Sequence, residues 1–246
     1  MLLLNLIMGN LQICEKPVPV NALPETVLEN VPKTFVKQTN PKTGDFESRI
    51  LRMHNNARKI NGLQPLVWDN SLQTKAADWL QFLKEKDNGS LTCSSMRHPG
   101  TEEDGTEAEV GEFLPGGNGQ NLYQASGSSY INYKFTPFDP SSPEDAVQQW
   151  YNECSIFNEL DPETYKGNNT VPDRFMEIGH MTQMLWKNAT KIGCSSSGCT
   201  DKVKGADGKL RDTMGQIINC HYDKGNVAGQ FYDQLPLDIK CGVNLI

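Results

Sequence analysis

Apolar residues recur at helical intervals just after residue 45. From residue 46 to residue 60 the intervals are four, three, four and three, which places the apolar side chains on one face of a helix. The members of this face are Phe46, Ile50, Met53, Ala57 and Ile60. Asp45 can cap the start and Asn61-Gly62 can end it, so the pattern predicts a helix over residues 46–60.

Two further helices are predicted by periodicity and by start signals. A helix is predicted over residues 70–86, because its apolar side chains form a stripe along one face. Lys84 and Lys86 in the last turn suit the negative end of the helix dipole. The stripe consists of Leu72, Ala76, Leu80 and Leu83, with Trp79 beside it. Ser142 and Pro143, followed by two acidic residues, are typical of a third helix start.

Strand-like patterns lie toward the C-terminal end of the chain. Residues 181–186 and 216–222 carry β-like runs, and Asp207-Gly208 is a suitable turn between strands. Because helices come first and strands later, the order favours an α+β fold whose layers contain a mainly antiparallel sheet.

Two stretches show no helical or strand period. Residues 23–45 carry three prolines and are predicted to form an extended leader. Residues 99–119 are rich in acidic residues and glycine, and the simplest interpretation is a solvated loop. Because long loops often carry the specific function of a protein, this loop and residues 159–177 are candidate receptor contacts.

Composition and charge exclude two classes of protein. The 246 residues have 23 basic and 30 acidic side chains, a net charge of −7. An acidic chain lacks the positive surface that nucleic-acid binding needs. The mean hydropathy is −0.53, and no apolar run approaches the roughly 18 residues of a spanning helix, so an integral membrane protein is not expected.

The cysteine count points to export. Residues 1–22 are predicted to be a signal peptide, because MLLLNLIM is apolar and Val20-Asn21-Ala22 suits signal peptidase. Cleavage after Ala22 would remove Cys14 and leave six of the seven cysteines, enough for three disulfides in any of fifteen pairings. The alternative is an uncleaved segment, since no positive charge precedes the apolar run. The prediction is a secreted, extracellular protein.

Three Asn-x-Ser/Thr sequons agree with export from a eukaryotic cell. They lie at Asn88, Asn168 and Asn188, in stretches that read as loops or ends of elements. Each is a candidate glycosylation site, because a glycan needs an exposed position.

Five segments in order carry a resemblance to a known family. They read HNNARKINGLQPLVWDNSLQTKAADW (54–79), GQNLY (119–123), AVQQWYNE (146–153), GHMTQMLWKNATKIGC (179–194) and INCHYDKGNVAGQF (218–231). Together they closely resemble the CAP superfamily of cysteine-rich secretory, venom antigen and pathogenesis-related proteins. The resemblance covers residues 46–235, which leaves a C-terminal tail at 236–246.

The resemblance implies a three-layer α-β-α sandwich with a large cleft. In the family two histidines and two acids meet in that cleft, and the matching positions are His98, Gln120, Glu153 and His180. Gln120 stands where many members have glutamate, although some members also carry GQN. An amide oxygen is neutral and a weaker metal ligand than a carboxylate.

Two interpretations of this cluster stay open. His98, Glu153 and His180 could bind a divalent metal such as zinc, and a metal-dependent hydrolase would follow from that ligand set. The alternative is a hydrogen-bonded polar cluster without metal. No GxSxG or other nucleophile motif occurs, so no catalytic residue is assigned.

The family pattern also implies disulfides. It pairs Cys93 with Cys199 and Cys194 with Cys220, whereas a zinc site is disfavoured because no second Cys or His pair stands at zinc-finger spacing. Cys154 and Cys241 remain. They either pair with each other by elimination, or Cys154 is a free buried thiol.

Four aromatic residues between GQNLY and Ser142 suggest a ligand. Tyr130, Tyr133, Phe135 and Phe138 resemble the aromatic loop of sterol-binding CAP proteins, and aromatic side chains can cover a flat apolar molecule. The alternative is that they pack their own loop onto the core. The leading hypothesis is a non-enzymatic protein that binds a sterol, a fatty acid or a membrane partner, with a hydrolase or a receptor-binding protein as alternatives.

Overall fold

The computed structural model describes residues 45–100, 107–131, 134–137, 142–161, 174–204, 208–227 and 229–246. The predicted signal peptide and almost all of the predicted leader lie outside these residues. The helices are α1 (Phe46–Ile60), α2 (Asn70–Lys86), α3 (Glu107–Phe113), α4 (Pro143–Asn152), α5 (Cys154–Phe157), α6 (Phe175–Met184) and α7 (Phe231–Gln234), with 3₁₀ turns η1 (Cys93–Ser95) and η2 (Pro115–Gly117). The strands are β1 (Val67–Trp68), β2 (Gly119–Ile131), β3 (Lys134–Pro137), β4 (Lys191–Lys204) and β5 (Leu210–Tyr222).

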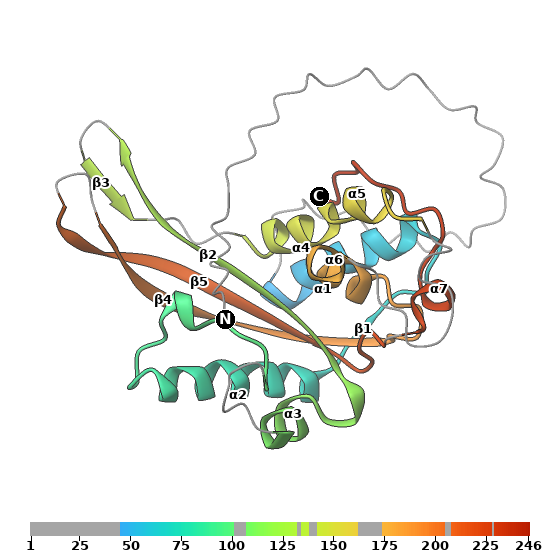
Figure 1. The fold of residues 1–246 in the computed structure, drawn as a ribbon, viewed down its shortest axis with the longest axis horizontal. Helices are drawn as coiled ribbons and strands as arrows, with labels where there is room; N and C mark the ends of the chain where they lie inside the picture. Colours follow the sequence, from blue (N-terminus) through green and yellow to red (C-terminus); the bar gives the residue numbers. More distant parts are fainter. Residues whose placement is uncertain are drawn as a thin grey trace. The chain divides into compact units, whose positions relative to one another are not determined.

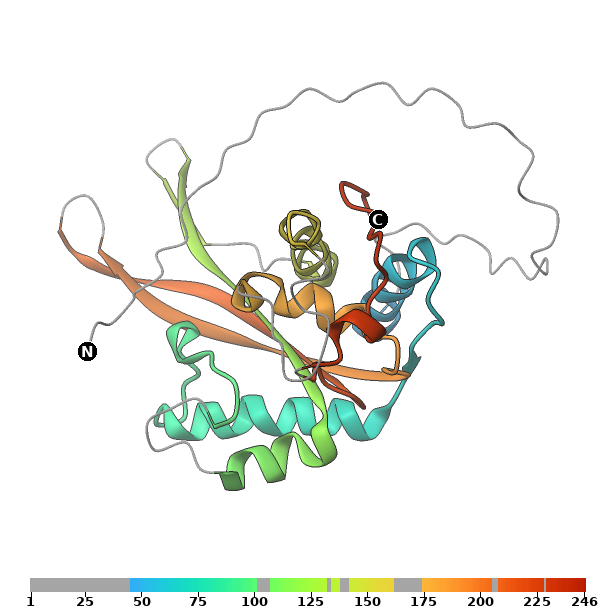
Figure 2. The ribbon, with the colours of Figure 1, turned by 45° about the vertical axis from the view of Figure 1, so that its right-hand side comes forward.

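The described strands form one sheet in the order β1-β4-β5-β2-β3. The pair β1 and β4 is parallel, and the other neighbours are antiparallel, so the sheet is mixed. Helices α2 and α3 cover one face, while α1, α4, α5 and α6 cover the other (Figure 1). This is the three-layer α-β-α sandwich that the resemblance implied. The two long hairpins, β4-β5 and β2-β3, extend beyond the helices (Figure 2).

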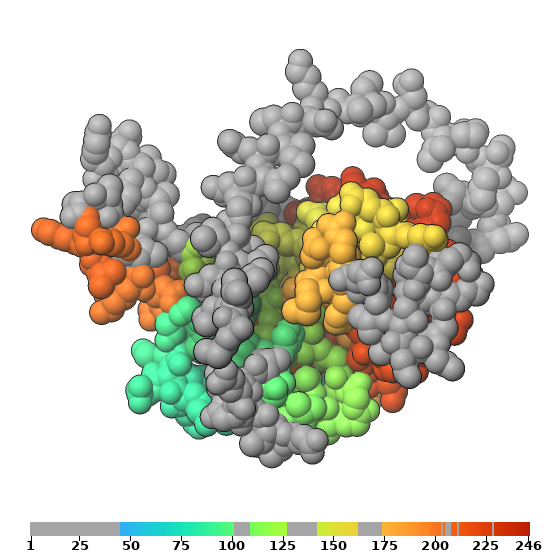
Figure 3. Space-filling model, in the orientation of Figure 1, coloured from blue at the N-terminus to red at the C-terminus, as the bar shows by residue number. Residues whose placement is uncertain are grey.

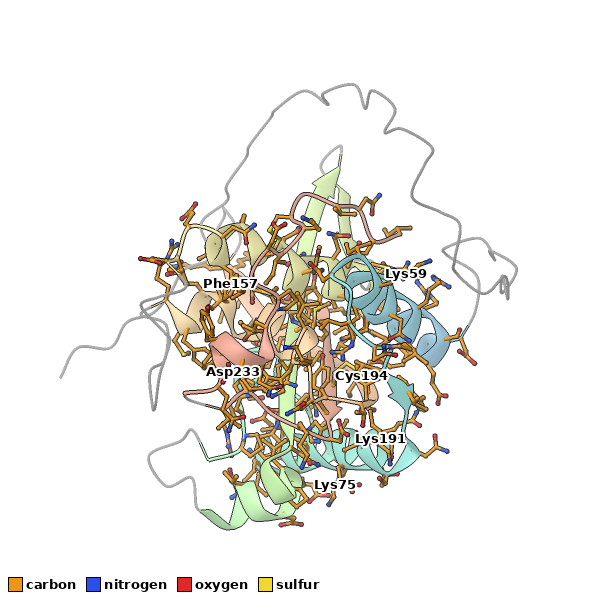
Figure 4. The ribbon with its side chains drawn as sticks, turned by 90° about the vertical axis from the view of Figure 1, so that its right-hand side faces the viewer. Lys59, Lys75, Phe157, Lys191, Cys194 and Asp233 are labelled. Carbon is orange, nitrogen blue, oxygen red and sulfur yellow. A yellow bond between two sulfur atoms is a disulfide. The ribbon has the colours of Figure 1, made fainter. Side chains whose placement is uncertain are left out.

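Each face of the sheet has its own apolar core. Side chains of α1, α4 and α6 pack on one face around Trp150, Met181 and Ile218. Side chains of α2 and α3 pack on the other face around Trp79, Phe113 and Ile217. Figure 4 marks Cys194 in the first core and Lys59 on the exposed side of α1.

Local signals explain where the helices begin. The carboxylate of Asp45 accepts from the Ser48 amide, and Asp69 accepts from the amides of Ser71 and Leu72. Ser142 forms a capping box with Asp145, and Pro143 occupies the first turn. These side chains satisfy amides that have no partner inside the helix. The predicted helices at 46–60 and 70–86 and the predicted start at Ser142 are therefore confirmed.

One predicted strand is wrong. Residues 181–186 were predicted as β, but the segment up to Met184 belongs to helix α6. Ile178, Met181 and Met184 are fully buried at intervals of three, so the helical period of the longer segment overrides the short β-like run. The predicted strand at 216–222 lies within β5, which pairs with β2 and with β4. Strand β4 was not predicted, because the run around Ser195 is polar.

The acidic stretch is not simply a solvated loop. Residues 107–113 form α3, and Phe113 is buried against Trp79 of α2. Glu109 pairs with Arg97 at 2.8 Å and accepts from the amide of Gly100 at 3.0 Å. The carboxylate of Glu109 therefore links α3 to Arg97 and Gly100. Residues 101–106 lie outside the described part.

Candidate functional site

A cleft of about 380 Å³ opens at the edge of the sheet where β2 begins. Its lining comes from the loop after η1, the start of β2, helix α6 and the loop after β5. The lining side chains include His98, Gln120, Phe175, Met176, His180 and Asn226. In Figure 3, α6 is at the surface beside the green segments around β2. The cleft therefore joins both helical layers at one sheet edge.

His180 is positioned by two contacts on the α1 side of the sheet. Its Nδ1 lies 2.6 Å from Oε1 of Glu153, the residue that ends α4. The second carboxylate oxygen accepts from the amide of Met181 at 2.9 Å, which fixes the carboxylate to the turn that carries the histidine. The indole of Trp150 stacks on the ring with centroids 5.9 Å apart. His180 is thus held by a hydrogen bond at one edge and by packing on one face.

His98 is held from the other side of the sheet. Its Nδ1 lies 2.6 Å from Oε1 of Gln120, and Nε2 of Gln120 lies 3.1 Å from Nε2 of His221. Gln120 and His221 are direct register partners on β2 and β5, so their side chains share one face of the sheet. His221 is fully buried, whereas His98 is exposed at the cleft.

The loop that carries His98 is anchored to α2. The disulfide Cys93–Cys199 ties its start to β4. The indole N–H of Trp79 donates to the carbonyl of Arg97 at 3.0 Å, and the Arg97 guanidinium lies 5.0 Å over the same ring. These contacts fix the backbone of the residue that precedes His98.

The structure brings all four predicted cleft residues to this place, as two separate pairs. His98 bonds to Gln120, and His180 bonds to Glu153, while His98 and His180 line the same cleft.

The donor set does not fit the predicted metal site at His98, Glu153 and His180. In the part of the chain that the structure describes, no group of three His, Cys, Asp or Glu side chains is arranged to hold a metal ion. Glu153 uses both oxygens on His180 and Met181, so it orients a histidine instead of completing a ligand set. With Gln120 as an amide, two imidazoles remain, fewer than the three protein ligands of a catalytic zinc site.

Sequence reasoning missed the polar side chains beneath the cleft. Asn219 and His221 are fully buried on the α2 face of β5. On the opposite face, Asn121 donates to the carbonyl of His180 at 3.0 Å and to the Tyr222 hydroxyl at 3.1 Å. The signal was present in INCHY, where polar and apolar residues alternate at the period of a strand with two buried faces.

Burial lowers the pKa of the two fully buried histidines, His54 and His221. The pKa of His54 falls to about 4, mainly because the ring is desolvated, although its bond to the Ile50 carbonyl opposes the shift. The pKa of His221 falls to about 3 by desolvation, with the positive charges of Lys75 and His98 acting in the same direction. Although the His98 ring is exposed at the cleft, surrounding protein atoms partly desolvate it and lower its pKa too.

These shifts predict acid sensitivity. Between pH 6.5 and about 4, the unfolded chain binds protons at His54 and His221 that the folded chain does not, so stability falls as pH falls. Each histidine steepens the slope by up to ~1.4 kcal/mol per pH unit. Urea unfolding at pH 6.5, 5.5 and 4.5 measures it. His54→Gln should reduce the slope by one proton, and an unchanged slope would contradict the assignment.

The remaining predicted residues are placed as follows. Three disulfides join Cys93 to Cys199, Cys194 to Cys220 and Cys154 to Cys241, so Cys154 is not a free thiol. The sequons Asn88 and Asn188 are exposed, and Asn168 lies outside the described residues. Tyr130 and Phe135 are register partners in the β2-β3 hairpin. Tyr133 and Phe138 lie outside the described residues.

The comparisons with known proteins identify the family of the chain. The family model described as the cysteine-rich secretory protein (CAP) family matches residues 51–222, and the chain belongs to this family. It is similar to pathogenesis-related protein PR-1 of Medicago truncatula, with 26% identity over 86% of this chain and 91% of that protein. It is also similar to fruiting body protein SC14 of Schizophyllum commune, with 27% identity over 80% of this chain and 71% of that protein.

The chain is also similar to the solved structure of Schistosoma mansoni venom allergen-like protein 4. It is 17% identical, the match covers 80% of this chain and 97% of that one, and the TM-score is 0.38. None of the described helices is both long enough and apolar enough to cross a lipid bilayer.

Proposed function

We propose that this protein acts outside the cell by binding a small, mainly apolar molecule of the sterol or fatty-acid type in the cleft, without covalent chemistry. The observation that supports this most is the lining of the cleft. Phe175 and Met176 give it an apolar side, and Met176 is 89% exposed, while His98, Gln120 and His180 give it a polar side. Its volume lies in the range of about 300 to 1,000 Å³ that is usual for small-molecule sites.

The chemistry of the lining favours binding over catalysis. The described residues around the cleft include no serine, threonine, cysteine or lysine that could act as a nucleophile beside His180. Glu153 and His180 form an oriented pair, but an oriented base needs a reacting group within hydrogen-bond reach.

The aromatic hairpin is a separate candidate place for the same ligand. Tyr130 lies ten positions after Gln120 on β2, and at a rise of about 3.3 Å per residue this is about 33 Å. One small molecule cannot contact both the cleft and the paired positions Tyr130 and Phe135. The experiment must therefore separate the two places.

Filling the cleft from α6 provides a sharp test. Gly179 lines the cleft, and an added Cβ would meet only the Phe175 ring at 3.7 Å, so there is room for a side chain. Gly179→Met should weaken binding of radiolabelled cholesterol by about tenfold or more, since its side chain would occupy the ligand volume. The helix should not lose stability, because glycine is a poor helix former.

Gly179→Ala is the matched control and should bind nearly as the parent does. The double change Tyr133→Ala with Phe135→Ala tests the hairpin. Loss of binding in the double variant, with full binding in Gly179→Met, would show that the ligand binds at the hairpin and not in the cleft. Absence of cholesterol and fatty-acid binding in the parent would reject the proposed function.

A further inference from the structure

A chain of hydrogen bonds leads from the backbone of α2 to the cleft. In its first bond, only one assignment of donor and acceptor is possible. Nδ2 of Asn219 lies 2.9 Å from the carbonyl oxygen of Ala76. A carbonyl can only accept, so the amide nitrogen must face it. Turning the amide would set Oδ1 of Asn219 against the carbonyl oxygen. The orientation of this buried side chain is therefore fixed.

The fixed amide determines the tautomer of His221. Nδ2 of Asn219 also lies 3.2 Å from Nε2 of His221, and a donor there requires an unprotonated ring nitrogen. Nδ1 of His221 has no partner among the described residues, so the tautomer is set from the Nε2 side alone. The neutral ring, favoured by its burial, carries its proton on Nδ1.

The same reasoning passes through Gln120 to His98. The atom of Gln120 that lies 3.1 Å from Nε2 of His221 must be a donor, which is the amide nitrogen. Oε1 of Gln120 then faces Nδ1 of His98 at 2.6 Å, and only a protonated Nδ1 can donate to it. In the neutral ring, Nε2 of His98 is an acceptor.

The second histidine of the cleft has the same tautomer for a different reason. Nδ1 of His180 lies 2.6 Å from the Glu153 carboxylate, which accepts only. In the neutral ring Nε2 of His180 is thus also an acceptor. Contacts on opposite faces of the sheet therefore give both cleft imidazoles the same tautomer, with a protonated Nδ1 and an acceptor at Nε2.

We propose that Asn219 and His221 are positioning residues that hold His98 as the Nδ1–H tautomer through Gln120, matching the tautomer of His180, and that the cleft recognises its ligand through a hydrogen-bond donor, a hydroxyl group, which Nε2 of His180 accepts. The second part rests on the proposed function and narrows it. An apolar alcohol can donate its O–H to an unprotonated ring nitrogen. A ketone or a carboxylate has only acceptor atoms, so it cannot donate to that nitrogen. The class of ligand is an alcohol such as a sterol, in preference to a fatty acid.

The tautomers can be measured without any ligand. The chain contains four histidines, so a long-range proton–nitrogen NMR spectrum at pH 8 is simple to assign. We expect the Nδ1–H pattern for His98, His180 and His221. His54 serves as an internal control, because its Nδ1 faces the Ile50 carbonyl at 2.9 Å on the other side of the sheet.

Two variants at one position separate the relay from general damage. Gln120→Leu should release His98 from the Nδ1–H tautomer and leave His54 and His180 unchanged. Gln120→Glu should keep His98 in that tautomer, because a carboxylate also accepts. An Nε2–H pattern for His98 in the parent protein, or no change in Gln120→Leu, would overturn the relay.

Ligand preference is then measured with pairs that differ only in the polar group. 5α-Cholestan-3β-ol should bind roughly tenfold more tightly than 5α-cholestan-3-one, and hexadecanol more tightly than hexadecanoate. Equal or tighter binding of the ketone and the carboxylate would overturn the donor rule. If no member of either pair binds, the proposed function and the donor rule fail together, while the tautomer result stands or falls by its own spectrum.

Discussion

Replacing Arg58 by methionine should lower the free energy of unfolding by about 4 kcal/mol or more. Arg58 is fully buried, and its guanidinium donates to the carbonyls of Gln64, Met184, Trp186 and Ala189 at 2.7 to 3.0 Å. Burial lowers its pKa to about 10, so the group is still charged at pH 7. Methionine keeps much of the apolar stem but removes the Arg58 donor from all four carbonyls, and three of these hydrogen bonds are buried.

The matched control is Lys59→Met on the next residue of the same helix. Lys59 is exposed, so its replacement should change stability by less than about 0.5 kcal/mol. Urea unfolding followed by tryptophan fluorescence measures both variants. Equal effects for the two would contradict the claim that Arg58 fastens α1 to the segment between α6 and β4.

Removing the Cys93–Cys199 disulfide is the second change with a large expected effect. The two cysteines are 106 residues apart, and closing a loop of that length is worth about 4 to 5 kcal/mol on the chain-entropy account. Both cysteines are buried, so Cys93→Ala with Cys199→Ala avoids placing a hydroxyl in the core. We also expect weaker ligand binding at temperatures where the variant is still folded, because this bridge anchors the His98 loop.

The Cys154–Cys241 bridge provides the comparison. Its loop of 87 residues is of similar length, but it ties the C-terminal segment to α5, away from the His98 loop. Cys154→Ala with Cys241→Ala should therefore cost comparable stability and leave cholesterol binding intact in the folded protein. Loss of binding in both variants at matched stability would show that the His98 loop has no special dependence on its own bridge.

Much of the helical framework could be predicted from local signals. Asp45 and Ser142 cap helices with their own side chains, and the apolar residues of α2 recur at regular helical intervals in the sequence. β4 could not be predicted, because the run around Ser195 is polar and is stabilised by pairing with β5. The segment ending at Met184 was wrongly predicted as a strand, because its last few residues fit a strand. The apolar pattern of the whole segment from Phe175 fits a helix.

The candidate site was predictable only in part. Motif resemblance found His98, Gln120 and His180, which line the cleft from segments far apart in the chain, and Glu153, which contacts His180. Asn219 and His221 escaped it because their role depends on register with β2 and on a carbonyl of α2, which no single segment encodes.

Photoaffinity labelling with a diazirine analogue of cholesterol would show where on the chain the ligand binds. After irradiation and digestion, mass spectrometry identifies the labelled peptides, and excess unlabelled cholesterol shows which labels are specific. We expect competed adducts at residues 175–183 and 118–121, where α6 and β2 border the cleft. Competed adducts confined to residues 130–138, or none anywhere in the chain, would contradict it.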